Sequence, residues 1–220
     1  FGTIEKYGEL NRNCLGLFAP YFSAYQQWRN NGLKAMQESV AKGEKVTAIT
    51  MDLAGFYHNV GPRFLLRPTF LAEIGVELSV NERKLTLHLL DSIDTWYDAS
   101  PDKSLRPEGA LPVGLSASKI ISNVLLHQLD VEIRDHMNPI YYGRYVDDLF
   151  LVIPTPPGAK SGRDILKAMA DALPCLVVKF KKGEQADLKL KLPYASDSNL
   201  FFTASKQKIF NLSSEHGLDL

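Results

Sequence analysis

The order of hydrophobic and polar positions predicts a chain of mixed helices and short strands. Helix-forming residues dominate 25–41, and Gly43 ends that pattern. The following segment, 45–52, is short and rich in β-branched residues, which predicts a buried strand. A period of two places alternate residues of this strand on one face: Val46, Ala48, Thr50 and Asp52. The strand therefore ends with a carboxylate that can face a cleft.

Two further helices are expected in the middle of the chain. Ser79 and Glu82 have the spacing of a capping box, which predicts that a helix begins there. Its expected apolar stripe consists of Leu85, Leu89, Ile93 and Trp96. A second helix is predicted over 118–134. One side is expected to hold Ile121, Leu125 and Gln128/Leu129, and the polar flank Ser118, Lys119, Ser122 and Asn123.

Two apolar segments, 140–146 and 149–153, surround an Asp147-Asp148 pair. Their length and composition predict two strands joined in a tight hairpin, with both acids at its tip. The apolar flanks indicate that both arms are buried, so the two carboxylates are presented by rigid backbone.

The last third of the chain predicts one helix and two more strands. Ile165, Leu166, Met169 and Leu173 form a helical stripe, and strands are expected over 176–180 and 188–192. Helices and strands do not alternate in regular βαβ units. The predicted fold class is therefore α+β, an antiparallel sheet flanked by helices.

Composition excludes several classes of protein. With 45% hydrophobic and 23% charged residues among 220, the chain is globular in composition and not disordered. No apolar run has the length of a membrane span, and no signal peptide is visible, so no membrane partner is expected. Cys14 and Cys175 are far apart and in no metal-binding spacing, which fits a reducing cytoplasm. The net charge of zero gives no support for nucleic-acid binding, so function must be argued locally.

Three carboxylates carry that local argument: Asp52 at a strand end, and Asp147 with Asp148 at a hairpin tip. At about 4 Å and an effective dielectric constant near 20, two full charges repel by roughly 4 kcal/mol. A fold that gathers three acids must raise their pKa values or bind a cation. Oxygen ligands in a site open to phosphate suit Mg²⁺, and two such ions can drive transfer of a nucleotide.

Three ordered motifs resemble those of reverse transcriptases. Residues 145–148, Tyr-Val-Asp-Asp, resemble the family's Tyr-x-Asp-Asp hairpin. Residues 52–57, with an aspartate and an aromatic residue five positions later, resemble the upstream motif. Residues 111–118 and the segment after them resemble the Leu-Pro-Gln-Gly loop and its helix. The similarity is greatest to bacterial enzymes of the group II intron, retron and defence-associated kinds.

The resemblance implies a role for particular residues. Asp52, Asp147 and Asp148 would bind two Mg²⁺ ions, with Mn²⁺ as a substitute, and the Leu53 carbonyl would be a further ligand. Tyr57 would be the steric gate that excludes a 2′-hydroxyl. Residues 203–210 resemble a later motif whose lysine approaches the triphosphate; Lys206 aligns best, and Lys208 is the alternative. The remaining nucleotide contacts would be Gly114, Ser118 and Tyr145.

The resemblance also implies an architecture, that of a right-hand polymerase palm with partial fingers. Residues 1–44 would be the partial fingers and 45–220 the catalytic palm. The thumb would be absent or lie beyond the C-terminus, and the start at Phe1 suggests a piece of a longer protein.

The predicted function is RNA-directed DNA polymerase activity, in bacterial antiphage defence with a dedicated noncoding RNA. The expected partners are an RNA template or noncoding RNA, nascent DNA and dNTPs, with a homo- or hetero-oligomer left open, in the bacterial cytoplasm. One alternative is a catalytically atypical RNA-binding scaffold, although all three acids are present. Another is an RNA-dependent RNA polymerase, which Tyr57 and the tyrosine-led hairpin disfavour.

Several positions depart from the family or leave two interpretations open. Val113 replaces the usual glutamine of the loop and Lys119 a frequent proline, so template dependence is in question and an unusual product is a hypothesis. Arg144 is expected either to reach primer or triphosphate, or to pair with a nearby acid. Aromatic and basic residues of 21–29 are expected to pack in the core or to stack on template bases: Tyr21, Tyr25, Trp28 and Arg29.

Overall fold

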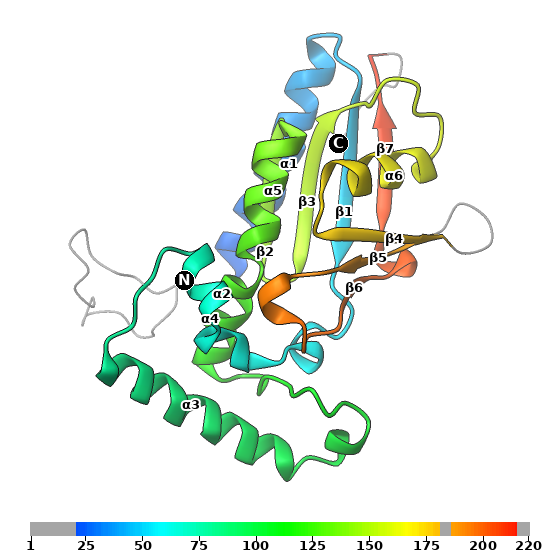
Figure 1. Cartoon of the computed structure of the whole chain (residues 1–220). Helices are drawn as coiled ribbons and strands as arrows, with labels where there is room; N and C mark the ends of the chain where they lie inside the picture. The colour runs from blue at the N-terminus through cyan, green and yellow to red at the C-terminus, as the bar shows by residue number, and fades with distance from the viewer. Residues whose placement is uncertain (1–20, 181–185, 215–220) are drawn as a thin grey trace.

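A four-stranded antiparallel sheet forms the centre of the molecule (Figure 1). The computed structural model describes residues 21–180 and 186–214. The sheet consists of β1 (Val46–Asp52), β2 (Tyr141–Tyr145), β3 (Asp148–Pro154) and β7 (Lys208–Leu212), in the order β2-β3-β1-β7. The mixture of helices with antiparallel sheet confirms the predicted α+β class.

The predicted strand and hairpin form as the sequence indicates. β1 lies in the middle of the sheet and pairs with β3 from Val46↔Pro154 to Asp52↔Asp148. β2 and β3 form the predicted hairpin, with Tyr145 opposite Asp148. The pairing of β7 with β1 was not predicted. Its outward residues are largely exposed, as at Phe210, so this edge strand lacks the apolar run that reveals β1.

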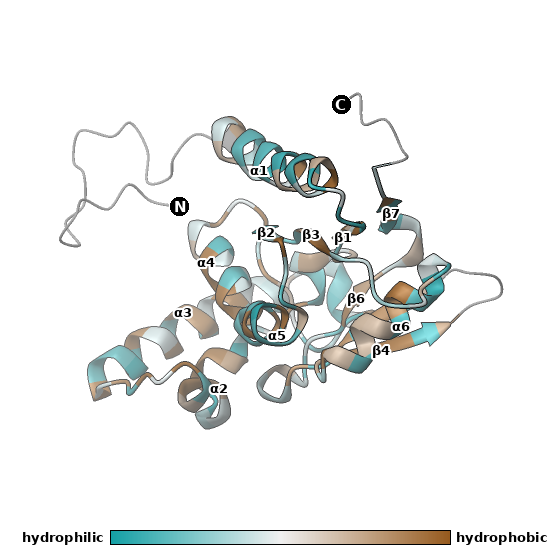
Figure 2. Cartoon of the chain, turned by 90° about the horizontal axis from the view of Figure 1, so that it is seen from above, coloured by the Kyte–Doolittle hydropathy of each residue, from teal (hydrophilic) through white to brown (hydrophobic). Residues whose placement is uncertain are grey.

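Helix α1 (Tyr21–Ala41) covers one face of this sheet (Figure 2). Its Met36 and Val40 are buried against Val46, Phe150 and Val152. The helix approaches closely because Gly32 faces the Phe150 ring and Gly143 faces Trp28. An ideal Cβ on Gly143 would lie 2.7 Å from Trp28 Cδ1, nearer than packed carbon atoms approach. The predicted helix over 25–41 is confirmed and begins four residues earlier.

The opposite face of the sheet carries the main core. Helices α5 (His127–Met137) and α6 (Gly162–Ala172) lie on this side, and both views place them across the sheet from α1 (Figures 1 and 2). Burial of Ile165, Leu166, Met169 and Leu173 confirms the stripe predicted for α6. Leu149, Leu151 and Ile153 of β3 contribute the sheet's side of this core.

The prediction of one helix over 118–134 is wrong. The segment forms α4 (Ser116–Leu125) and α5, separated at Leu126, whose N–H donates to the Asn123 and Val124 carbonyls. Leu125, Leu126 and Leu129 are all fully buried, which a straight helical stripe does not achieve. Ile121 and Leu125 are on the apolar side as expected.

The predicted polar flank of this segment is also wrong in part. Ser118 and Ser122 are fully buried, whereas Ile120 is exposed. Ser122 Oγ donates to the Lys119 carbonyl, so a local hydrogen bond lets the hydroxyl enter the core.

Helix α3 (Val80–Asp98) lies at the periphery and follows the short α2 (Pro68–Glu73) (Figure 1). The Ser79–Glu82 capping box forms as predicted. The predicted stripe is wrong in part: Ile93 is buried and Leu89 packs against the core, but Leu85 and Trp96 are exposed, and Leu90 and Tyr97 are buried instead. The stripe is displaced because this helix packs only along one side of its second half.

A second antiparallel sheet supports the end of β1. It consists of β4 (Leu176–Phe180), β5 (Ala186–Leu190) and β6 (Leu200–Phe202), in that order. The strand predicted over 188–192 lies two residues earlier, and β6 was not predicted. An isolated bridge between Leu53 and Phe202 joins this sheet to the segment after β1.

Some expectations fall outside the described residues, among them Cys14 and the first 20 residues of the predicted fingers. Cys175 is buried and is a free thiol. A search of the described residues found no helix with both the length and the hydropathy needed to span a bilayer.

We expect Gly32→Ala to lower the free energy of unfolding by about 1 kcal/mol or more. A methyl group there overlaps the Phe150 ring, and overpacking costs roughly 1–3 kcal/mol, which outweighs the helix-propensity gain of about 1 kcal/mol. Urea unfolding measures the change. The exposed neighbour provides a control, because Asn31→Ala should be neutral or slightly stabilising. Equal stabilisation by both substitutions would contradict the close contact of α1 with β3.

Candidate active site

Backbone pairing brings two of the three predicted acids together. Asp52 ends β1 and Asp148 begins β3, and the two residues are cross-strand partners. The Leu53 N–H donates to the Asp147 carbonyl over 3.4 Å, so the third acid lies beside the same strand end. Asp52 and Asp148, 96 positions apart in the sequence, are thus held at one end of the sheet by its register.

Asp147 occupies a two-residue turn of unusual backbone conformation. Tyr145 pairs with Asp148, so the turn consists of Val146 and Asp147. Val146 has a φ of 58°, in the left-handed region where hairpin turns usually have glycine. A β-branched residue in this conformation costs roughly 1–3 kcal/mol and persists only where surrounding contacts enforce it.

The electrostatics of the turn match a cluster of like charges. Burial raises the pKa of Asp147 to about 6, and the charges of Asp52 and Asp148 add to the shift. Burial and the Asp52 charge also raise the pKa of Asp148. The carboxylates therefore resist ionisation unless a cation is close to them.

Lys206 supplies a cation within the protein. It lies at the end of a 3₁₀ turn, Ala204–Lys206, between β6 and β7, and its ammonium forms an ion pair with Asp52. The hydrogen bond to Asp52 raises the pKa of Lys206, and the charges of Asp147 and Asp148 act in the same direction. Lys206 therefore reaches Asp52 from a turn. The alternative, Lys208, lies on β7 opposite Thr50.

The donor set has the chemistry of a site for a hard cation, but the side chains are not arranged as a closed one. Within residues 21–180 and 186–214, no group of three or more His, Cys, Asp or Glu side chains is arranged to hold a metal ion. The Oδ1 atom of Asp52 is paired with the Lys206 ammonium. Three neighbouring carboxylates still suit Mg²⁺ by charge and ligand type. Binding would require Lys206 to leave Asp52.

Of the other predicted site residues, Tyr57 and Gly114 lie on two connected segments, whereas Leu53 and Ser118 are buried. Tyr57 lies in the 3₁₀ turn Phe56–Asn59 after β1, and its carbonyl accepts from the Leu111 N–H at 2.8 Å. This bond joins the first motif to the loop that contains Gly114, whose φ is 94°. The Leu53 side chain and Ser118 are both buried, so the Ser118 hydroxyl is not placed to contact a nucleotide.

The aromatic residues of α1 pack against the hairpin. The Tyr25 ring meets Tyr145 edge to face, with ring centroids 5.5 Å apart. Trp28 packs on Phe150, and its carbonyl accepts from Tyr141 Oη at 2.7 Å. These contacts support the core interpretation for Tyr25 and Trp28. Arg29 is exposed, and nothing is described of the Tyr21 side chain.

Arg144 pairs with an acid, as one of its two interpretations stated. It forms an ion pair with Asp130 of α5 over 2.7 Å. The sequence did not reveal Asp130 or Asn123 as partners of Arg144, because they lie on separate helices, α5 and α4, and no local pattern predicts that both meet one side chain.

Comparison with known families agrees with the motifs. The family model described as reverse transcriptase (RNA-dependent DNA polymerase) matches residues 10–189, which is most of the chain. The matched span contains Asp52, Asp147 and Asp148 and ends before Lys206. A search among curated proteins finds no match.

We expect Asp147→Asn to stabilise the metal-free protein at pH 8 by about 1 kcal/mol. The folded pKa of about 6 exceeds the ordinary value of 3.8, so ionisation destabilises the folded state as pH rises from 4 through 6. The shift corresponds to at most about 3 kcal/mol, which partial exposure to solvent reduces. Urea unfolding in EDTA measures the gain, which should be about half as large at pH 5 and disappear near pH 4.

The exposed acid Asp171 on α6 provides the control, since Asp171→Asn should change stability little at either pH. A gain from Asp147→Asn that does not depend on pH would contradict the assigned charge repulsion.

Proposed function

We propose, since this chain belongs to the reverse transcriptase family, that it adds deoxynucleotides to a 3′-hydroxyl with two Mg²⁺ ions bound by Asp52, Asp147 and Asp148. Membership makes the chain an RNA-directed DNA polymerase, a nucleotidyltransferase that takes an RNA template and nucleotide substrates. The family generally uses divalent metal ions. Within it, the region described here would be the palm, with α1 as part of the fingers.

The observation that carries the metal proposal is the register of β1 with β3. It sets Asp52 opposite Asp148, with the Asp147 turn beside them. A fully solvated Asp-Asp turn would not contain a half-buried acid with a pKa of about 6. Perturbed acids at a strand end indicate a functional site more often than a structural one.

The chemistry follows from what each side chain is able to do. Bound Mg²⁺ ions supply activation of the 3′-hydroxyl and stabilisation of the charge that develops on the phosphates. Asp52, Asp147 and Asp148 would hold these ions; the 3′-hydroxyl loses its proton to solvent, and its oxygen bonds to the α-phosphorus as the bond to pyrophosphate breaks. The Lys206 ammonium, released from Asp52, neutralises the leaving pyrophosphate or donates a proton to it.

Substrate choice is assigned to the turn after β1. Tyr57 lies partly buried beside Phe56, with ring centroids 5.9 Å apart, which limits the movement of its ring. A fixed ring at this position would clash with a 2′-hydroxyl and so favour dNTPs. Val113 lies 73% exposed on the loop before α4. Its side chain has no group that can hydrogen-bond to template or nucleotide, so the product can be atypical.

The biological proposal rests on resemblance alone. We place the enzyme in the bacterial cytoplasm, in antiphage defence with a dedicated noncoding RNA, as a homo- or hetero-oligomer. Its support is the similarity to defence-associated enzymes together with Val113 and Lys119, which depart from the family's usual residues.

One observation favours a second function, a polymerase-like scaffold that binds RNA without catalysis. Lys206 occupies Asp52, and the carboxylates are not arranged as a closed metal site within the described residues. A scaffold would retain this ion pair permanently, whereas an enzyme would open it when metal and nucleotide bind.

We expect Asp147→Ala to reduce nucleotide incorporation by at least about 10³-fold, because it removes a carboxylate to which the reaction's charge stabilisation is assigned. Extension of a DNA primer on an RNA template, with dNTPs and Mg²⁺, measures the change. Asp171→Ala serves as the matched control, and circular dichroism verifies folding. Unchanged incorporation by folded Asp147→Ala would eliminate the two-metal mechanism, and an inactive wild type would favour the scaffold.

We expect Tyr57→Ala to raise the efficiency of ribonucleotide incorporation relative to deoxynucleotide incorporation by about 10- to 100-fold, since loss of a steric clash is worth a few kcal/mol. The ratio of kcat/KM for matched rNTP and dNTP measures the change. Tyr57→Phe is the control, because it retains the ring and should retain discrimination. A ratio unchanged in Tyr57→Ala would remove the steric-gate assignment.

A further inference from the structure

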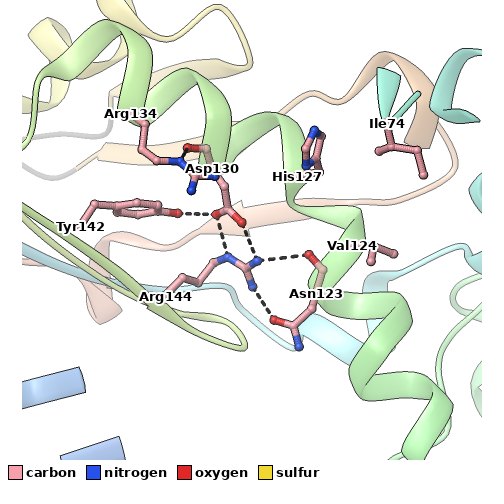
Figure 3. A pocket seen from close by; sticks show the side chains of 8 residues that line it. All are labelled: Ile74, Asn123, Val124, His127, Asp130, Arg134, Tyr142 and Arg144. Carbon is pink, nitrogen blue, oxygen red and sulfur yellow. Dashed lines mark hydrogen bonds and ion pairs between the residues drawn. The ribbon is translucent and has the colours of Figure 1, made fainter. Parts of the chain in front are cut away.

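Arg144 uses all five of its N–H donors, and each contact is within hydrogen-bonding distance. Figure 3 shows the contacts to Asp130 and Asn123. Nε and Nη2 donate to the two carboxylate oxygens of Asp130 at 2.9 and 2.7 Å. Nη1 and Nη2 donate to the side-chain and backbone oxygens of Asn123 at 3.0 and 3.1 Å. The fifth donor, on Nη1, reaches the Val146 carbonyl at 2.7 Å.

These contacts connect three separate parts of the fold. Asn123 belongs to α4, Asp130 to α5, and Val146 to the turn between β2 and β3. The Arg144 side chain is only 10% exposed and that of Asp130 18%, so solvent does not replace these bonds. The Tyr142 hydroxyl also donates to Asp130, which fixes the carboxylate from a second direction (Figure 3).

The fifth contact falls at the strained residue of the hairpin. Val146 adopts a positive φ without the conformational freedom of glycine, so external contacts must hold it there. Residues of β2 alternate in direction, and Arg144 holds the turn from the side of α5. On the other side, the Tyr25 ring of α1 contacts Tyr145. The tip of the hairpin is therefore fixed from both faces of the sheet.

We propose that Arg144 is a positioning residue, which fixes the Val146–Asp147 turn to α4 and α5 and so sets the positions of the Asp147 and Asp148 carboxylates. Its bidentate bond to Asp130 holds the guanidinium plane, and this plane directs the remaining donor to the Val146 carbonyl. The consequence for catalysis rests on the proposed function, whereas the consequence for the turn does not.

The decisive variants are Arg144→Gln and Arg144→Lys. Lysine retains a charge for Asp130 but has no planar fork, so it cannot bond Asp130, Asn123 and Val146 together. Asp130→Asn keeps the size of the carboxylate and loosens the guanidinium indirectly. Arg134→Gln is the matched control, because Arg134 lies in the same pocket, is exposed, and among the described residues donates to the Asp130 backbone carbonyl and not to its carboxylate.

Hydrogen exchange of the metal-free protein, followed by mass spectrometry, tests the turn without any reaction. We expect peptides that cover 145–149 to exchange about tenfold faster or more in both Arg144 variants, with α6 and β4 unchanged. Asp130→Asn should give a smaller increase at the same peptides, and Arg134→Gln none. No increase at the turn, or an even increase over the whole sheet, would overturn the proposal.

Primer extension tests the consequence for the carboxylates. We expect both Arg144 variants to lower kcat by about 10- to 100-fold, because displacement of a reacting group by about 1 Å has this effect. The Mg²⁺ concentration for half-maximal rate should rise several-fold, while KM for dNTP changes less than about twofold. A kcat within twofold of Arg134→Gln would overturn the proposal.

The two proposals fail in different ways. Inactive wild-type protein with a loosened turn in Arg144→Lys refutes the polymerase assignment and leaves the positioning role intact. Active wild-type protein, inactivated by Asp147→Ala but not by folded Arg144→Gln, refutes the positioning role alone. If Arg144→Gln does not fold, Arg144→Lys and Asp130→Asn decide the question by the same measurements.

Discussion

Mutual repulsion among three carboxylates at one end of a sheet is the constraint on which this structure depends. The register of β1 with β3 fixes Asp52 opposite Asp148, and the hairpin turn adds Asp147. Such a cluster is stable only if a proton or a cation neutralises part of its charge. In this structure the Lys206 ammonium does so at Asp52, while the pKa of Asp147 rises to about 6 through burial and the neighbouring charges.

The rest of the fold holds these charges where they repel. Gly32 and Gly143 allow α1 to approach the hairpin closely, and Tyr25 contacts Tyr145 on that face. On the other face, Arg144 ties the Val146 carbonyl to Asp130 and Asn123. A strained turn between two packed faces has little freedom to separate its carboxylates, and this rigidity would suit the proposed binding of cations in fixed geometry.

The sequence predicted what short-range patterns determine. The β-branched run before Asp52, the apolar arms around Asp147-Asp148 and the Ser79 capping box each specify local structure, and each formed as expected. Features that no short-range pattern specifies were not predicted. The break at Leu126 and the shifted stripe of α3 depend on what packs against each helix, and the pairing of β7 and the Arg144–Asp130 bond depend on residues distant in sequence. The motifs identified the acids, but their mutual arrangement required the sheet.

The central claim is that cations bind among Asp52, Asp147 and Asp148 in place of the Lys206 ammonium. The most direct test is anomalous diffraction at the manganese edge from crystals grown with Mn²⁺ and a dNTP. The account predicts anomalous peaks bordered by the three carboxylates, with Lys206 moved away from Asp52 toward the phosphates. Peaks located only elsewhere, with Lys206 still paired to Asp52, would contradict it.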